Sequence, residues 1–251
     1  MITLDILGPP LLAGFLVCLT HVPLGRQVLD RGIIFLDLAI AQIAALGVLA
    51  ALLINAELSN IWVQSIAVLS ALTGAAGLQV CERFWPDIQE ALIGATFVLA
   101  ATASILFLAH NPHGAEQMQE LLAGQILWVS YTQLIPVAVL YAVVLALLFF
   151  AKSLGRWVFY VSFSLAVTAS VQLIGVYLVF ASLILPALAV RHIKNSKALW
   201  IGYLVGILGY ALGLLFSSLF DLPSGPLIVW VLAGVAVLVA WGRKLFMLNL
   251  A

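Results

Sequence analysis

The chain has 251 residues, of which 65% are hydrophobic and only 8% are charged, and its mean hydropathy is +1.23. This composition excludes an ordinary water-soluble globular protein. The 10 basic and 10 acidic residues balance to no net charge, which leaves no basic surface for a nucleic-acid partner. We therefore expect an integral membrane protein, surrounded by lipid.

Apolar runs of about 20 residues recur along the whole chain, and each is long enough to cross roughly 30 Å of hydrocarbon as a helix. They predict an all-α fold, a polytopic helical bundle with eight or nine membrane elements in a single domain over residues 1–251. In chain order the predicted elements are 4–20, 33–54, 61–80, 91–109, 132–151, 157–174, 176–190, 199–217 and 227–247.

Three features of these elements bear on the topology and packing of the chain. The first has neither a basic leader nor a small-residue cleavage site, so we expect a membrane span and not a signal peptide. Only Gly175 separates 157–174 from 176–190, so this pair is either two spans, one broken helix or a re-entrant hairpin. The eighth element carries two G-x-x-x-G spacings from Gly202 to Gly213, which predict a close helix neighbour in the same chain or in a second copy.

The basic residues predict the orientation of the chain. If the N-terminus is outside and the C-terminus is cytoplasmic, all of them fall on the cytoplasmic side, as the positive-inside rule requires. They are Arg26, Arg31, Arg83, Lys152, Arg156, Arg191, Lys194, Lys197, Arg243 and Lys244. The outer connections then carry only acidic charges, which indicates either an entrance that attracts cations or simply the sorting of basic residues to the inside.

Asp37 and Gln42, in the second element, are the candidates for a translocation path. An ionisable group inside a membrane is costly, so Asp37 is either functional or held near the inner interface, where Arg31 is a possible partner. Gln42 lies deeper, where its carbonyl would contact a passing ion or bind a neighbouring helix. The lone His21, at the predicted end of the first element, is expected to be a hydrogen-bonded interface residue.

A polar segment, HNPHGAEQMQE, follows the fourth element on the predicted outer side. Imidazole and carboxylate groups are ligands that zinc, manganese and iron accept, so His110, His113, Glu116 and Glu120 are candidates for an outer metal entrance. A solvated polar loop is the alternative.

The chain contains no G-x-x-x-x-G-K-[ST] phosphate loop, and we expect it to be neither an enzyme nor the carrier of a cofactor. Any ATP must be used by a partner subunit. A basic turn follows the broken helix pair and Pro186 on the predicted cytoplasmic side, and it is typical of a docking element. Its residues are Arg191, His192, Lys194 and Lys197.

Five segments in order resemble the metal-type ABC permease family, whose members import zinc, manganese or iron. The segments are FLDLAIAQIAALG, EALIG, LLAGQILWVS, GVYLVFASLILPALAVRH and FDLPSGPLIV. The resemblance implies a homodimeric permease with an ion path between subunits or helix bundles. It also implies an ABC ATPase docked at the turn after Pro186 and an extracellular or periplasmic metal-binding protein on the outer face.

The sequence departs from the family pattern in the second element. Many members carry a histidine five residues before the glycine that is here Gly47, and an aspartate four residues before that histidine. Here these positions are Gln42 and Leu38, while Asp37 is shifted by one. An ion-coupled secondary transporter without an ATPase is the alternative function, and an intramembrane enzyme is a weaker one because no catalytic motif is found.

Overall fold

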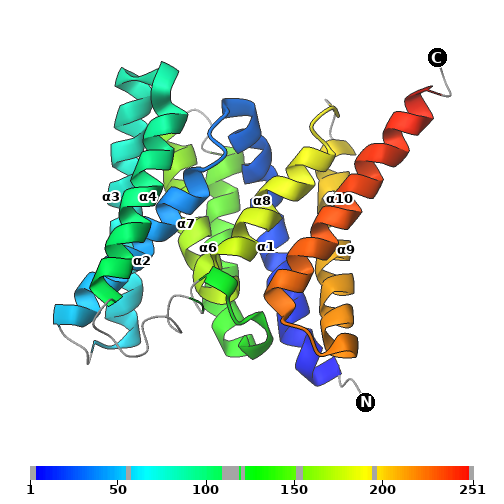
Figure 1. The fold of residues 1–251 in the computed structure, drawn as a ribbon, viewed down its shortest axis with the longest axis horizontal. Helices are drawn as coiled ribbons and strands as arrows, with labels where there is room; N and C mark the ends of the chain where they lie inside the picture. The colour runs from blue at the N-terminus through cyan, green and yellow to red at the C-terminus, as the bar shows by residue number, and fades with distance from the viewer. Residues whose placement is uncertain are drawn as a thin grey trace. The chain divides into compact units, whose positions relative to one another are not determined.

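The computed structural model describes residues 4–54, 58–108, 119, 122–150, 155–193 and 197–248. Within these ranges every regular element is a helix, and no strand occurs (Figure 1). The long helices are α1 (Leu4–Arg31), α2 (Leu36–Ile54), α3 (Asn60–Phe84), α4 (Gln89–Leu108), α6 (Tyr131–Phe150), α7 (Arg156–Ile174), α8 (Val176–Ala189), α9 (Lys197–Phe220) and α10 (Ser224–Leu248). The short 3-10 helices η1 (Pro86–Ile88) and η2 (Ile126–Trp128) precede α4 and α6.

The all-α prediction is confirmed for this part of the chain. Among the described residues, 7 helices are long and apolar enough to cross a membrane, namely α1, α3, α4, α6, α7, α9 and α10. The apolar stretches of α2 and α8 are shorter. All 7 tryptophans are exposed, as expected of side chains that face lipid and its headgroups.

The predicted first element, 4–20, is too short. Helix α1 continues to Arg31 with Pro23 inside it, so Arg26 and Arg31 lie in the helix and not in a loop after it. The apolar pattern resumes beyond the proline, where Val22, Leu24 and Val28 are fully buried. Packing of these side chains keeps the chain helical, and proline is tolerated inside membrane helices.

The predicted interruption at Gly175 is confirmed. Gly175 has φ 79° and ψ 163°, a backbone conformation that is open almost only to glycine, and it separates α7 from α8. Helix α8 has 14 residues, or about 21 Å at 1.5 Å per residue, which is less than the roughly 30 Å of hydrocarbon.

The chain divides into two compact units. The first comprises residues 1–31, 123–138 and 173–251, and the second comprises 32–122 and 139–172.

In the first unit, α8 packs against α1, α9 and α10 (Figure 1). Most of the side chains of α8 are buried. The glycines of α9 allow this close packing. A Cβ at Gly202 or Gly206 would meet Val22 or Cys18 of α1, and one at Gly209 or Gly213 would meet Leu232 or Ile228 of α10. The close neighbours that the two G-x-x-x-G spacings predict are therefore in the same chain.

One end of α8 is also held by backbone contacts. Gly124 and Gly175 both have positive φ, and a Cβ on either would meet the backbone of the other. A Cβ at Gly225, at the start of α10, would meet the carbonyl oxygen of Ala123. Three of the five family-like segments thus meet at one junction of the first unit.

In the second unit, α2 packs against both α3 and α4. Gly47 of α2 lies against Ser70, and Gly74 of α3 lies against Ile43, so the two helices approach closely at two levels. The first turns of α2 are buried on nearly all sides, which places Asp37 and Gln42 inside this unit.

Candidate functional site

The start of α2 is a buried region of the second unit that contains polar groups. Glu90, in the first turn of α4, accepts a hydrogen bond from the backbone N–H of Phe35 at 3.2 Å and a second from that of Ile34. This carboxylate therefore caps α2 from a different helix, where the positive end of the helix dipole favours a negative charge. The carboxylates of Asp37 and Glu90 are close enough to interact electrostatically.

Asp37 itself is only 1% exposed. Its own backbone N–H and that of Leu38 lie beside the carboxylate, yet Oδ1 has no hydrogen-bond partner among the described residues. The second predicted element begins at 33, but residues 33–35 precede the helix, so Asp37 lies in its first turn.

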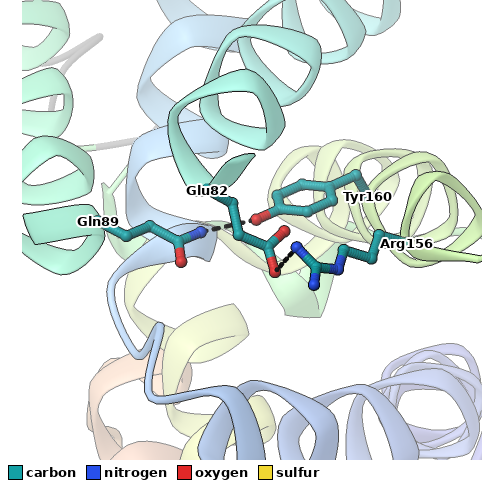
Figure 2. Close-up of polar contacts among 4 residues, drawn as sticks. All are labelled: Glu82, Gln89, Arg156 and Tyr160. Carbon is teal, nitrogen blue, oxygen red and sulfur yellow. Dashed lines mark hydrogen bonds and ion pairs between the residues drawn. The ribbon is translucent and has the colours of Figure 1, made fainter. Parts of the chain in front are cut away.

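Two polar contacts join the ends of three other helices at this level (Figure 2). Arg156, at the start of α7, lies 3.5 Å from Glu82, near the end of α3. Gln89, at the start of α4, donates a hydrogen bond from Nε2 to the hydroxyl of Tyr160 at 2.8 Å. Together with the Glu90 cap, these contacts fix the ends of α2, α3, α4 and α7 at a common level.

Gln42 is 4% exposed and lies one and a half turns further along α2. It is five residues from Asp37, so the two side chains point about 140° apart around the helix. The structure places both inside the second unit but does not bring them onto one face.

Sequence reasoning missed other buried polar groups of this unit. Gln79, Glu90, Ser162 and Thr168 each have a buried oxygen without a hydrogen-bond partner in the described part of the chain. A polar residue inside an apolar run could have indicated these positions. Single serines and threonines are common in membrane helices, however, so the sequence alone does not distinguish these from others.

His21 is not at the end of a span, as the sequence suggested, but near the middle of α1, where it is fully buried. Its Nδ1 lies 3.1 Å from the carbonyl oxygen of Val17 and 3.0 Å from the hydroxyl of Thr20, so the predicted hydrogen bonding is confirmed. The predicted position at the end of the helix is wrong, because α1 continues for 10 residues beyond His21, to Arg31.

The predicted docking turn begins directly after α8. Arg191 and His192 are exposed, and Arg191 donates a hydrogen bond from Nε to His192 Nε2 at 2.9 Å. Lys197 is the first residue of α9. Lys194 and the predicted outer ligands His110, His113, Glu116 and Glu120 lie outside the described residues.

Within the described ranges, no group of three or more His, Cys, Asp and Glu side chains is arranged to hold a metal ion. The polar groups of the second unit are instead spread along several helices.

Comparison with known proteins identifies the family. The model of the ABC 3 transport family matches residues 3–159 and 153–243, which is nearly the whole chain. The chain belongs to the ABC 3 transport family. The resemblance drawn from the five segments is thereby confirmed, and so is the multi-pass membrane character that the composition predicts.

Two relatives align with this chain over most of their length. The high-affinity zinc uptake system membrane protein ZnuB of Haemophilus influenzae is 23% identical over 264 residues, covering 96% of this chain and 98% of that protein. A protein of Chlamydia trachomatis named "Probable metal transport system membrane protein" is 24% identical over 253 residues, covering 91% and 86%.

The fold of the ABC 3 chain also resembles a solved structure. PsaBC from Streptococcus pneumoniae, in complex with Fab, matches with a TM-score of 0.73 and 21% identity, covering 93% of this chain and 90% of that chain. This likeness supports the course of the helices along nearly the whole chain.

Proposed function

We propose that this chain is the permease subunit of an ABC importer for divalent metal ions, zinc, manganese or iron, in the bacterial inner membrane. It provides the translocation path over residues 1–251 as one permease domain, and a separate ATPase hydrolyses ATP. The observation that carries the proposal is the match to the ABC 3 transport family over nearly the whole chain. The name of the Haemophilus influenzae relative, a zinc uptake protein, supports the choice of metal as substrate.

We further propose that the N-terminus is outside and the C-terminus cytoplasmic, with eight or nine membrane elements once α2 and α8 are included. In this orientation the basic residues at the ends of α1 and α3, and at the starts of α7 and α9, all face the cytoplasm. The polar ends of α2, α3, α4 and α7 then lie at the cytoplasmic surface, where charged groups are readily solvated.

Gln42 and Asp37 are proposed to line the path. Both are buried in the second unit. The resemblance of the second element to the family pattern implies that Gln42 occupies a position where many members carry histidine. An amide oxygen is a neutral ligand for a passing cation, which would be held more weakly than by imidazole.

The partners follow from the family. The ATPase is proposed to dock at the turn from Arg191 to Lys197, which lies between the buried helix α8 and α9 and has exposed side chains at Arg191 and His192. A metal-binding protein outside the membrane is proposed to deliver the ion to an outer entrance that contains His110, His113, Glu116 and Glu120. A second copy of the chain completes the permease as a homodimer.

Metal accumulation in cells tests this function. A strain that lacks the gene for this chain should contain less zinc, manganese or iron than its parent when that metal is scarce, by elemental analysis. Expression of the intact chain should restore the content of the same metal. Equal metal contents in both strains, under scarcity of each metal in turn, would contradict the proposal.

A further inference from the structure

The turn that precedes α2 has no polar side chain of its own. Residues 32–35 are Gly, Ile, Ile and Phe, so none of them can cap the helix as serine, threonine, asparagine or aspartate would. The backbone N–H groups of this turn receive an acceptor from another helix instead. Those of Ile34 and Phe35 both donate to the carboxylate of Glu90, in the first turn of α4.

The next backbone N–H groups have acceptors nearby in the chain. Leu36 donates to the carbonyl oxygen of Ile33 at 3.2 Å. The N–H groups of Asp37 and Leu38 lie beside the carboxylate of Asp37. Of the acceptors that serve this helix start, Glu90 alone comes from a different helix, so it ties α2 to α4 as well as satisfying the turn.

The charge of Glu90 suits its place between two helix starts. Glu90 is the second residue of α4, and its carboxylate also meets the start of α2, so it lies at the positive ends of two helix dipoles. Two positive ends that lie close together repel each other. A shared negative charge offsets this repulsion and favours the pairing of the two helix starts.

The packing of α2 against α3 differs from its packing against α4. Gly47 lies against Ser70 and Gly74 lies against Ile43, so α2 and α3 interlock at two levels. Helix α4 has one glycine, Gly94, and a Cβ added there would meet nothing within 4 Å. No glycine of α4 therefore fixes its register with α2, and the contact of Glu90 is suited to do so.

We propose that Glu90 is a positioning residue for the translocation path, which holds the start of α2 against α4 and so fixes the depth and rotation of Gln42. Gln42 lies about 10 Å along the helix from Phe35, at 1.5 Å per residue. A displacement of the helix start would displace Gln42 with it. The inference rests on the proposed function, since the position of Gln42 matters to transport only if Gln42 contacts the passing ion.

Metal uptake by variants of the complete complex tests this role. Glu90→Ala removes the acceptor, and Glu90→Gln keeps an acceptor oxygen but removes the charge. Asp87→Ala is the matched control, because Asp87 is an exposed acidic residue in η1, close to Glu90 in the sequence. Each variant is made both with Gln42 and with Gln42→Leu. The probe is radioactive zinc, manganese or iron, delivered by the binding protein.

We expect Glu90→Ala to lower the maximal rate of uptake by about ten-fold, which is the effect of losing a hydrogen bond to a charged group. Glu90→Gln should lower it less, and Asp87→Ala should not change it. In the Gln42→Leu background, Glu90→Ala should cause no further loss, because both changes remove the same contact to the ion. If Glu90→Ala does not assemble, Glu90→Gln in the two backgrounds carries the same test.

Amide hydrogen exchange tests the cap without reference to transport. The N–H groups of Ile34 and Phe35 should exchange about ten-fold faster in Glu90→Ala than in the unmodified complex. Unchanged exchange, an unchanged maximal rate, or the same fractional loss of uptake in both Gln42 backgrounds would overturn the positioning role. If the unmodified complex carries none of the three metals, the proposed function fails and the positioning role fails with it, whereas faster exchange would still show the cap.

Discussion

At the scale of single residues, α2 carries two buried polar side chains with different surroundings. Asp37 lies in the first turn beside backbone N–H groups and near the Glu90 carboxylate, which are the surroundings of a residue at a helix start. Gln42 lies deeper, and burial of an amide there is costly unless it serves a contact.

Replacement of Gln42 tests its place in the path. A polar contact to a charged group is worth about 1.5–3 kcal/mol, so Gln42→Leu should lower metal uptake by about 10- to 100-fold while the complex still assembles. Gln42→His should be tolerated, because imidazole is also a polar ligand that a passing cation accepts. Ile43→Leu, on the neighbouring face against Gly74, is the control and should transport normally. Normal uptake by Gln42→Leu would show that Gln42 only packs against neighbouring helices and does not line the path.

The junction of Gly124 and Gly175 gives a second test at this scale. Alanine at Gly175 would be strained by the positive φ, at a cost of about 1–3 kcal/mol, and would also meet the backbone of Gly124. Gly175→Ala and Gly124→Ala should therefore lower the melting temperature of the purified protein. Gly77→Ala, in α3 with nothing within 4 Å of the added Cβ, should not. Equal melting temperatures for all three variants would contradict the described junction.

At the scale of elements, the glycine pattern of α9 predicts that a helix packs closely against it, but it does not predict which helix. The spacing of its glycines predicts close approach of another helix but does not identify it, because any apolar helix fits such a surface. The structure identifies α1 for Gly202 and Gly206 and α10 for Gly209 and Gly213. The packing of α9 is thus part of the folding of one chain.

This assignment makes a prediction for the glycines. Gly206→Leu should lower the yield of folded, monodisperse protein, because the new side chain meets Cys18 of α1. Gly234→Leu, in α10 with open space around the added Cβ, should give the normal yield. Size-exclusion chromatography after membrane extraction measures both. Normal folding of Gly206→Leu with loss only of a dimer would contradict the assignment.

Most elements of this fold could be predicted from the sequence, because a run of apolar residues bounded by polar ones determines a membrane helix almost alone. The end of α1 could not, since Pro23 and Arg26 look like a boundary until the burial of Val28 is known. The polar contacts between helices of the second unit could not be predicted from the sequence either. Glu82 with Arg156, and Gln89 with Tyr160, are pairs that only the packing of separate helices brings together.

At the scale of the whole molecule, uptake must be coupled to ATP hydrolysis in a partner. The turn after α8 is suited to transmit movement of the ATPase to the permease. Helix α8 is packed among α1, α9 and α10, so displacement of the turn would also displace this helix. Replacing Arg191 and His192 together by alanine should abolish the stimulation of ATP hydrolysis by substrate and lower uptake. Expression should be normal, since both side chains are exposed. Unchanged substrate-stimulated hydrolysis in the reconstituted complex would contradict docking at this turn.

This chain is proposed to conduct a divalent metal ion while its partner ATPase hydrolyses ATP. The most direct measurement is uptake of radioactive zinc or manganese, or of iron, into proteoliposomes that contain this chain and its ATPase, with the metal-loaded binding protein outside and ATP inside. We predict accumulation that requires ATP and ceases with an ATPase variant that cannot hydrolyse it. Accumulation that is driven by an ion gradient without ATP, or no accumulation of any of the three metals, would contradict the account.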